Sequence, residues 1–408
     1  MNSNKTNKLK LLIVGAFVAF SHLVIGQSTT YEKMLINSDE TSRYDVTGSI
    51  INSDGNIIVY GYQSKNNYDP YYIEIDPATG DTLKWVDVPG TLYPERLKSL
   101  VELPTGGYIG VGYTTRSSNE YPWLIKLNKN GDTVFTKSFH NYSNSFTNCS
   151  SVLRGYFNDV IVNSSGDLVV TGQNDNCAQY STLIAQLDTA TGAIDWLNGV
   201  RSFNQDNGIT VESYRGHAIF EDGVNYVVAG AGYGGSSDKG TVIKFDSSGD
   251  TVWTAFASTR DLYDIIKASD GNYYATGESN PFSLYSNAAF VKLSAGGVVS
   301  QTTHISPTGT SWNYGYSIAE GPNTNEILIG GTSDWTNQSS DQTLHSVSTA
   351  GTLNYSKHFG FNDYNENTYL LVDGNNIYLT GCENWGWNAF ENYPAYNASS
   401  SQPHQLRP

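Results

Sequence analysis

Short runs in which apolar residues dominate or alternate with polar ones recur along almost the whole chain. Typical runs are 57–60 and 124–127, and tight glycine turns such as Asp54-Gly55 and Asn130-Gly131 separate them. Runs of this kind, rich in β-branched and aromatic residues and bounded by glycine turns, predict short antiparallel β-strands. We expect two-residue hairpin turns, in which glycine supplies the positive φ.

One glycine recurs near the end of the second run of each unit and makes the repeat countable. Two hairpins accompany it each time, so each unit predicts four short strands. A single sheet of this size cannot bury both faces, whereas sheets stacked around an axis can. The pattern therefore predicts an all-β fold, a seven-bladed β-propeller with four antiparallel strands per blade. The marker glycines are Gly61, Gly112, Gly172, Gly230, Gly277, Gly330 and Gly381.

The last repeat lacks a recognisable fourth strand. The segment Tyr31–Ile36 has the composition of an outer strand and compares well with Val134–Phe139. We therefore expect the N-terminal strand to close the last blade of the ring. The alternative is an open array with a damaged last repeat.

The N-terminus reads as a secretory signal peptide over residues 1–26. Three lysines precede the apolar run Leu11–Phe20, and small residues follow up to Gly26, which places cleavage near Gly26 and Gln27. The propeller then spans 27–393, and 394–408 form a disordered polar tail. The expected location is secreted, periplasmic or on the cell surface. No cysteine lies near the cleavage point, so we expect no lipid anchor. We also expect no membrane span.

The composition is acidic, with 39 Asp and Glu against 23 Lys and Arg and a formal net charge of −16. Such a charge argues against nucleic acid as a partner. We expect a monomer with no cofactor, and Ca²⁺ stays open as an alternative, because turns around Asp206 and Asp363 offer oxygen ligands without a complete calcium-loop pattern. No Cys and His spacing typical of a metal site occurs.

The cysteines permit one disulfide. Cys149 and Cys177 fall in loops that propeller topology places on one face, so they form a candidate pair in an oxidising compartment. Cys382 is then left over.

Loop length distinguishes the two faces of the predicted ring. The hairpin turns are short and uniform, while the loops on the opposite face are long, varied and rich in Tyr, Trp, Asn and Ser. Aromatic rings with adaptable amides and hydroxyls suit sugars and extended peptides. We therefore expect a glycan or an extracellular protein to bind this face. The candidate ligand-binding residues are Tyr68, Tyr121, Tyr142, Trp312, Tyr314, Trp335, Trp385, Trp387, Arg154 and Arg215.

The sequence contains little evidence for a catalytic motif. The segment Asp188–Trp196 resembles the tryptophan-docking motif of quinoprotein dehydrogenases, which packs blades together, but the adjacent cysteine pair of those enzymes is missing. The turn after Asp246 resembles the Asp-box of sialidases with a spacing one residue too long. Arginines at blade entries could face the channel, but no nucleophile pair accompanies them, so no catalytic residue is assigned. They are Arg43, Arg96, Arg154 and Arg215.

The segments 103–114 and 123–132 closely resemble a secreted propeller repeat of Bacteroidetes-type bacteria, of the form DGGYIVAGYT followed by WLIKLD and NGD. The resemblance covers about residues 31–382 and implies a secreted propeller, often joined to adhesion modules and a sorting domain for type IX secretion. It implies no activity. No sorting domain follows Trp387. We therefore expect a non-enzymatic binding scaffold; the alternatives are a glycan-active hydrolase or lyase, or a purely structural module.

Overall fold

The computed structural model describes the chain from Tyr31 to Pro394, with gaps. The described residues are 31–36, 44–63, 68–142, 153–175, 181–200, 202–204, 210–234, 237–279, 286–306, 310–335, 339–359, 365–383 and 387–394.

Every regular element in this part of the chain is a β-strand. In chain order the strands are β1 Tyr31–Ile36, β2 Tyr44–Ile51, β3 Ile57–Gln63, β4 Pro70–Ile75, β5 Thr82–Asp87, β6 Glu95–Glu102, β7 Tyr108–Arg116, β8 Asn119–Leu127, β9 Thr133–Ser138, β10 Gly155–Val162, β11 Leu168–Asn174, β12 Ser181–Leu187, β13 Ile194–Val200, β14 Ser202–Asn204, β15 Thr210–Asp222, β16 Asn225–Gly234, β17 Ser237–Phe245, β18 Thr251–Ala257, β19 Thr259–Lys267, β20 Tyr273–Ser279, β21 Ala288–Leu293, β22 Val299–Ile305, β23 Thr310–Glu320, β24 Glu326–Trp335, β25 Ser339–Ser348, β26 Leu353–Phe359, β27 Asn365–Asp373, β28 Asn376–Glu383 and β29 Trp387–Pro394.

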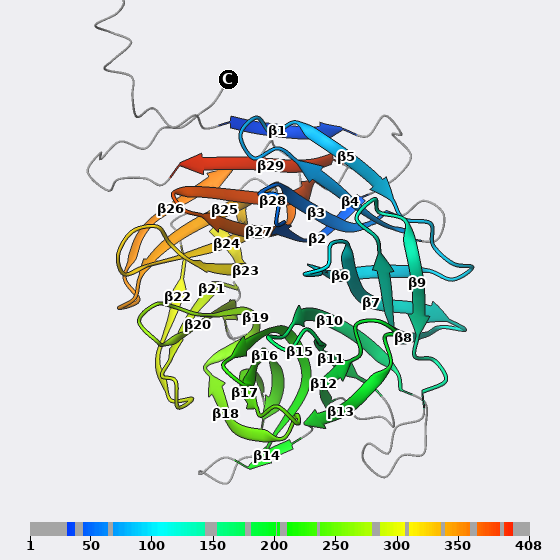
Figure 1. Cartoon of the computed structure of the whole chain (residues 1–408). Helices are drawn as coiled ribbons and strands as arrows, with labels where there is room; N and C mark the ends of the chain where they lie inside the picture. The colour runs from blue at the N-terminus through cyan, green and yellow to red at the C-terminus, as the bar shows by residue number, and fades with distance from the viewer. Residues whose placement is uncertain are drawn as a thin grey trace, which may run out of the picture.

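The strands form antiparallel sheets arranged around a common axis, as in a β-propeller (Figure 1). Six of the sheets are built from consecutive strands and are called blades 1 to 6: β2–β5, β6–β9, β10–β13, β14–β18, β19–β22 and β23–β26. A further sheet has the order β1-β29-β28-β27 and is called the composite sheet, because its strands come from both ends of the described chain. All-β architecture with antiparallel blades follows directly from the alternating sequence pattern.

The expected fold needs correction in its details. Six blades, not seven, are built from one continuous stretch of chain, and blade 4 carries a fifth strand, β14. The N-terminal strand does not close the ring, since β1 pairs with β29 at the outer edge of the composite sheet. Figure 1 shows β1 on the outside, whereas β2 packs against β27 and β28 at the junction of the first and last sheets. The strand β29 was not predicted from the sequence.

Side-chain hydrogen bonds join neighbouring sheets at the inner edge of the ring. Except for Thr380, which is on β28, the residues that make these bonds are on innermost strands, so the bonds hold the blades around the axis. They run from Thr47 Oγ1 to Leu97 O (2.9 Å), Ser99 Oγ to Asp159 Oδ1 (2.7 Å), Ile219 N to Asp159 Oδ2 (2.9 Å), between His217 Nε2 and Asp261 Oδ2 (3.2 Å), from Ile318 N to Asp264 Oδ2 (2.9 Å), Leu370 N to Ser317 Oγ (2.7 Å) and Thr380 Oγ1 to Ser49 Oγ (2.9 Å).

The glycine turns occur where the sequence places them, but not with the expected geometry. Gly55 has φ +82° and its N–H donates to Asn52 O at 2.9 Å, while Asn52 N donates to Asn56 O. This is a longer hairpin loop than the predicted two-residue turn, a turn of the common type followed by a glycine in the left-handed region. The same hydrogen bond recurs at Gly166 and Gly271. The positive φ was therefore predicted correctly, and the turn length was wrong.

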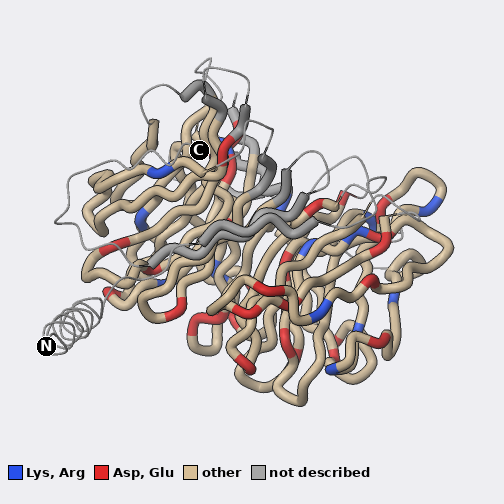
Figure 2. The backbone as a smooth tube through the Cα atoms, turned by 90° about the horizontal axis from the view of Figure 1, so that it is seen from above, with Lys and Arg blue, Asp and Glu red and all other residues tan. Residues whose placement is uncertain are grey.

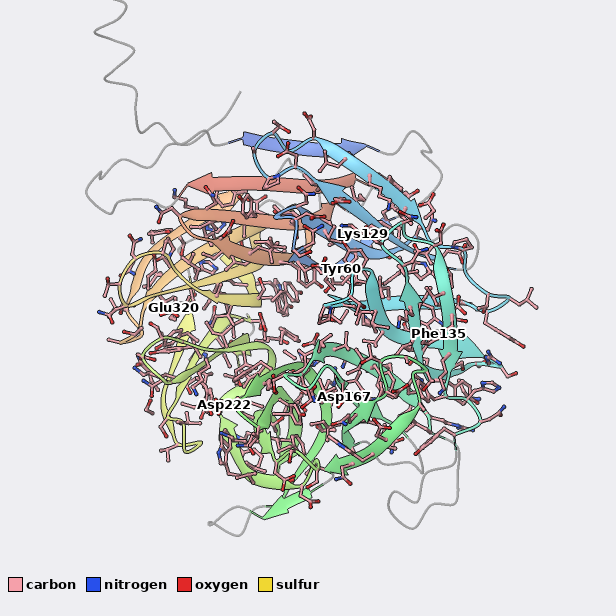
Figure 3. All side chains as sticks on the ribbon, in the orientation of Figure 1. Tyr60, Lys129, Phe135, Asp167, Asp222 and Glu320 are labelled. Atoms are coloured by element: carbon pink, nitrogen blue, oxygen red, sulfur yellow. The ribbon has the colours of Figure 1, made fainter. Side chains whose placement is uncertain are left out.

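Buried aliphatic and aromatic side chains fill the spaces between sheets, in clusters shared by adjacent blades. Tyr72 of blade 1 and Trp123 of blade 2 are almost completely buried in one such cluster. Further out, the second-hairpin glycine of one blade lies against an outer-strand side chain of the blade before it. The pairs are Gly131 with Val86, Gly192 with Phe135 (labelled in Figure 3), Gly249 with Trp196, Gly297 with Trp253 and Gly351 with Gln301.

Candidate functional site

The innermost strands of blades 1 to 6 share one irregularity, a β-bulge at the same point. A bulge re-aims the side chains around it, which is why such features concentrate at functional edges. The residue at the bulge and the residue two before it lie on one side of the strand. These six pairs are Asp45 and Thr47, Arg96 and Lys98, Tyr156 and Asn158, Arg215 and His217, Asp261 and Tyr263, and Tyr314 and Tyr316.

The marker glycine of each repeat explains why the bulge is so regular. A Cβ on Gly112 would come within 1.9 Å of Arg96 O, and one on Gly172 within 2.0 Å of Tyr156 O. Only glycine lets the second strand approach the inner strand this closely. In blade 6 the equivalent glycine is Gly331, whose Cβ would lie 1.9 Å from Tyr314 O, so the assignment of Gly330 as the marker is wrong.

Arg96 lies in a group of tyrosines drawn from blades 1 and 2. Its guanidinium carbon is 4.5 Å from the ring centre of Tyr68, 5.4 Å from Tyr62 and 5.6 Å from Tyr113. Arg96 Nη1 also donates to Tyr113 Oη at 2.7 Å. Tyr68 holds its ring over Arg96 from a backbone with φ +66°, a conformation that costs a non-glycine residue energy and often marks a functional position.

Aromatic side chains continue on blades 5 and 6 as a stacked series. Tyr263 stacks on Tyr316 with ring centres 5.4 Å apart and planes 29° apart, and Tyr316 stacks on Tyr314 at 5.9 Å and 25°. Trp312 ends the series, 6.4 Å from Tyr314 with planes 16° apart, and 40 % of its surface is exposed. At the other end, His217 meets Tyr263 edge to face at 5.3 Å.

The two groups are linked across blades 3 and 4. The ring of Tyr156 lies 5.6 Å from that of Tyr113, and Tyr156 Oη donates to Gln173 Oε1 at 2.8 Å. Burial raises the pKa of Tyr156 to about 12, although the nearby positive charge of Arg215 lowers it. Asp261 then accepts from His217, with Arg215 Nη1 3.9 Å away. We call this continuous set the aromatic arc: Tyr62, Tyr68, Arg96, Tyr113, Tyr156, Arg215, His217, Tyr263, Tyr316, Tyr314 and Trp312.

The aromatic arc lies at one end of the ring. Its members occupy the beginnings of inner strands and the ends of second strands, so they are opposite the hairpin turns that join those strands. This is the end from which the long loops leave. Figure 1 shows the inner strands β2, β6, β10, β19 and β23 bordering the centre of the ring. The side chains of the arc therefore come from all of blades 1 to 6.

Several carboxyl groups near the arc have raised pKa values. Burial raises the pKa of Glu120, and the charge of Asp175 adds to this. Burial also raises the pKa of Asp175. Asp69, next to Tyr68 in the chain, has its pKa raised to about 6 by burial and by the charge of Glu95. Burial thus favours the neutral form of these carboxyls more than exposure to water would.

The predicted ligand-binding residues are spread over several environments. Tyr68, Trp312, Tyr314 and Arg215 belong to the aromatic arc. Tyr121 instead meets His140 edge to face at 6.2 Å, Tyr142 packs on the core residue Phe139 at 6.4 Å, and Arg154 is exposed just before β10. Trp335 and Trp387 lie in β24 and β29, with side chains outside the described set, and Trp385, Cys149 and Cys177 fall outside the described residues.

Sequence reasoning missed part of the arc, and a usable signal was present. Arg96 was weighed only as part of a catalytic arginine set. Each marker glycine pairs across the sheet with one residue of the inner strand, as Gly112 pairs with Leu97. The residues directly before and after that partner are the two whose side chains lie on the bulge side of the strand, so the repeat alone locates both. The residues missed as ligand-binding candidates are Tyr62, Arg96, Tyr113, Tyr156, His217, Tyr263 and Tyr316.

Neither a metal-binding cluster nor a membrane-spanning helix occurs among the described residues. Over the described ranges, no group of three or more His, Cys, Asp or Glu side chains is placed to hold a metal ion. The turns around Asp206 and Asp363, the candidate Ca²⁺ ligands of the sequence analysis, fall outside those ranges. No helix among the described residues is long and apolar enough to cross a membrane.

Comparisons with known proteins find similar shapes but no similar sequences. No family model matches the chain, and no curated protein matches it. Among solved structures, a protein of unknown function from Dyadobacter fermentans is 9 % identical over 90 % of this chain and 98 % of its own, with a TM-score of 0.48. The Dos1 propeller is 10 % identical over 85 % of this chain and 81 % of its own, with a TM-score of 0.46. Sqt1 from Chaetomium thermophilum is 12 % identical over 84 % of this chain and 81 % of its own, also with a TM-score of 0.46.

Proposed function

We propose that this protein is a non-enzymatic binding protein that holds a glycan on the aromatic arc. The observation that carries the proposal is the stacked series Tyr263, Tyr316, Tyr314 and Trp312, whose rings run across two blades and end in a partly exposed indole. Pyranose rings present flat C–H faces, and aromatic side chains bind such faces with little loss of rotamer entropy. The half-buried tyrosine hydroxyls of the arc supply hydrogen-bond partners for sugar hydroxyls.

The series is preformed, which favours binding over plain scaffolding. Tyr263 Oη donates to Glu278 Oε2 at 3.3 Å, and Ser286 Oγ and Arg260 Nη1 hold the other carboxylate oxygen at 2.8 Å and 3.1 Å. These contacts fix one ring of the series from behind, so that ordering it costs nothing when a ligand arrives.

Replacing Trp312 by alanine should weaken glycan binding about 10-fold, because the exposed end of the series is lost. The affinity is measured by calorimetry, after a thermal-shift screen of residues 27–408 against polysaccharides has found a ligand, since a ligand that binds only the folded state raises Tm. Tyr93→Ala is the matched control: Tyr93 is 38 % exposed, but stacks on Arg116 outside the arc.

The outcomes separate the possible activities. Equal losses in Trp312→Ala and Tyr93→Ala would contradict the assignment of the arc. New reducing ends or unsaturated products in the binding reactions would show a hydrolase or lyase instead. A screen in which no polysaccharide shifts Tm, while an extracellular protein does, would replace the glycan by a protein ligand.

We also propose that the protein acts outside the cytoplasm, as the resemblance of its repeats to secreted Bacteroidetes-type propellers suggests. The support is the lysine-rich start followed by the apolar run Leu11–Phe20. Expression of the full chain in a bacterial host should yield an exported protein whose first residue is Gln27. N-terminal sequencing of the exported form tests this, and an unprocessed chain that stays in the cytoplasm would refute it.

A further inference from the structure

We propose that the glycan bound at the aromatic arc is anionic, and that Arg96 binds its carboxylate or sulfate groups. This rests on the proposed function. It adds the chemical class of the ligand and the residue that selects for it.

The first support is the electrostatic setting of Arg96. Three tyrosine rings lie within 5.6 Å of its guanidinium carbon, and the bond to Tyr113 Oη uses one of its five N–H donors. Aromatic faces and a neutral hydroxyl hold a guanidinium in place without neutralising it. The planar fork of Arg96 is therefore fixed and remains charged, the arrangement that suits bidentate binding of an oxyanion.

The second support is that Arg96 has no carboxylate partner among the described residues. Over the described residues, no carboxylate lies within 4.0 Å of Arg96 or of Lys98. On the far side of the ring, by contrast, Asp222 takes Lys244 at 2.5 Å and Lys267 at 2.6 Å (Asp222 is labelled in Figure 3). In a chain with an excess of acidic residues, a cation held among tyrosines instead of carboxylates is available for an external anion.

The third support is a second cation on the same side of the same strand. Lys98 is at the bulge of β6, two residues after Arg96, so both side chains leave the strand in the same direction. Burial lowers the pKa of Lys98, the charge of Arg96 lowers it further, and the charges of Glu120 and Asp45 raise it. A bound oxyanion would relieve the repulsion between the two cations.

The overall charge makes this a selective site, not a general attraction for anions. The net charge of −16 repels polyanions at long range, and Figure 2 shows acidic residues distributed over much of the described backbone with fewer basic ones between them. Attraction must therefore come from cations at the arc, among which Arg96 and Lys98 are neighbours on one strand. Non-specific adsorption of acidic polymers to the rest of the surface is correspondingly weak.

The test compares three classes of polymer on the same protein. Residues 27–408 are titrated with a uronate polymer (alginate or polygalacturonate), a sulfated polymer (dextran sulfate) and neutral dextran. We expect at least one anionic polymer to bind more tightly than dextran, and Arg96→Gln to weaken that binding about 10- to 100-fold. The uronate and sulfate titrations decide which oxyanion the site prefers.

Control variants keep the result interpretable. Arg116→Gln removes an arginine from the same end of the ring, where it stacks on Tyr93 at 4.2 Å outside the arc, and should leave anion binding unchanged. Arg96→Lys keeps the charge and loses the fork, so it should lie between wild type and Arg96→Gln. Tm of each variant shows that it is folded.

Two outcomes count against the proposals, and they differ. Neutral polymers that bind as well as anionic ones, or an unchanged affinity for the anionic polymer in folded Arg96→Gln, would overturn the anionic ligand and leave glycan binding intact. Failure of every polymer, neutral and charged, would overturn glycan binding itself.

Discussion

Replacing Gly297 by alanine should destabilise the protein by about 2–5 kcal/mol. Gly297 is in the turn before β22 with φ +83°, and an added Cβ would come within 2.6 Å of the indole of Trp253 on the preceding blade. Trp253 has little room to move, because it packs on the core of blades 4 and 5 and against Tyr273 with ring centres 6.0 Å apart. The free energy of unfolding from urea titrations measures the loss.

Gly271→Ala is the matched control for the backbone strain. Gly271 has φ +81°, almost the same conformation, but nothing lies within 4 Å of the position of an added Cβ. It should cost only about 1–2 kcal/mol, the strain of a left-handed alanine. Equal losses in the two variants would show that the glycine on Trp253 does not hold the blades together. In a Trp253→Leu background, the extra cost of Gly297→Ala should shrink, which a double-mutant cycle measures.

Stability should fall by about 2–4 kcal/mol as the pH rises from 5 to 8. Two carboxyls at the inner edge have raised pKa values, and desolvation is the main cause in both: Asp159 at about 6 and Asp264 at about 7. Both are acceptors for backbone N–H groups of a neighbouring blade, and Asp159 raises the pKa of Asp264 further. Urea titrations at fixed ionic strength across this pH range measure the effect.

The direction follows from proton linkage. An unfolded aspartate ionises near pH 4, so between about pH 4 and 7 the folded chain binds more protons than the unfolded chain. The stabilisation is complete below the unfolded pKa and disappears as the pH rises through 6 and 7. Asp222 acts in the opposite direction at lower pH: burial raises its pKa, but hydrogen bonds from Lys244, Lys267 and Tyr273 outweigh burial and lower it. We therefore expect maximal stability near pH 4–5.

Asp264→Asn isolates the buried group. This variant cannot ionise, so the decline between pH 5 and 8 should be roughly halved, whereas Asp250→Asn, on an exposed turn, should leave it unchanged. A decline of full size in Asp264→Asn would contradict the assignment. The ionisation of Tyr60 provides a second readout, because burial first and then the charges of Asp159 and Asp264 raise its pKa. Tyr60 is labelled near the centre of the ring in Figure 3.

The amino-acid sequence determined the local structure of this protein. Alternating apolar positions specify strands, and glycines such as Gly55 and Gly166 specify where the chain turns, because a positive φ is a property of a single residue. The order of strands within each blade follows, since consecutive hairpins pair with their neighbours. The contact of Trp196 with the next blade agrees with the resemblance of Asp188–Trp196 to the tryptophan-docking motif.

Only the tertiary structure shows how the two ends of the described chain pair and which side chains form the site. The pairing of β1 with β29 joins segments from opposite ends of the chain through backbone hydrogen bonds, which leave almost no mark on side-chain pattern. The grouping of Arg96 with Tyr62, and of Tyr263 with Tyr316, depends on how adjacent blades rotate around the axis. The repeat shows that each blade contributes side chains at its bulge, but only the packed ring shows which of them meet.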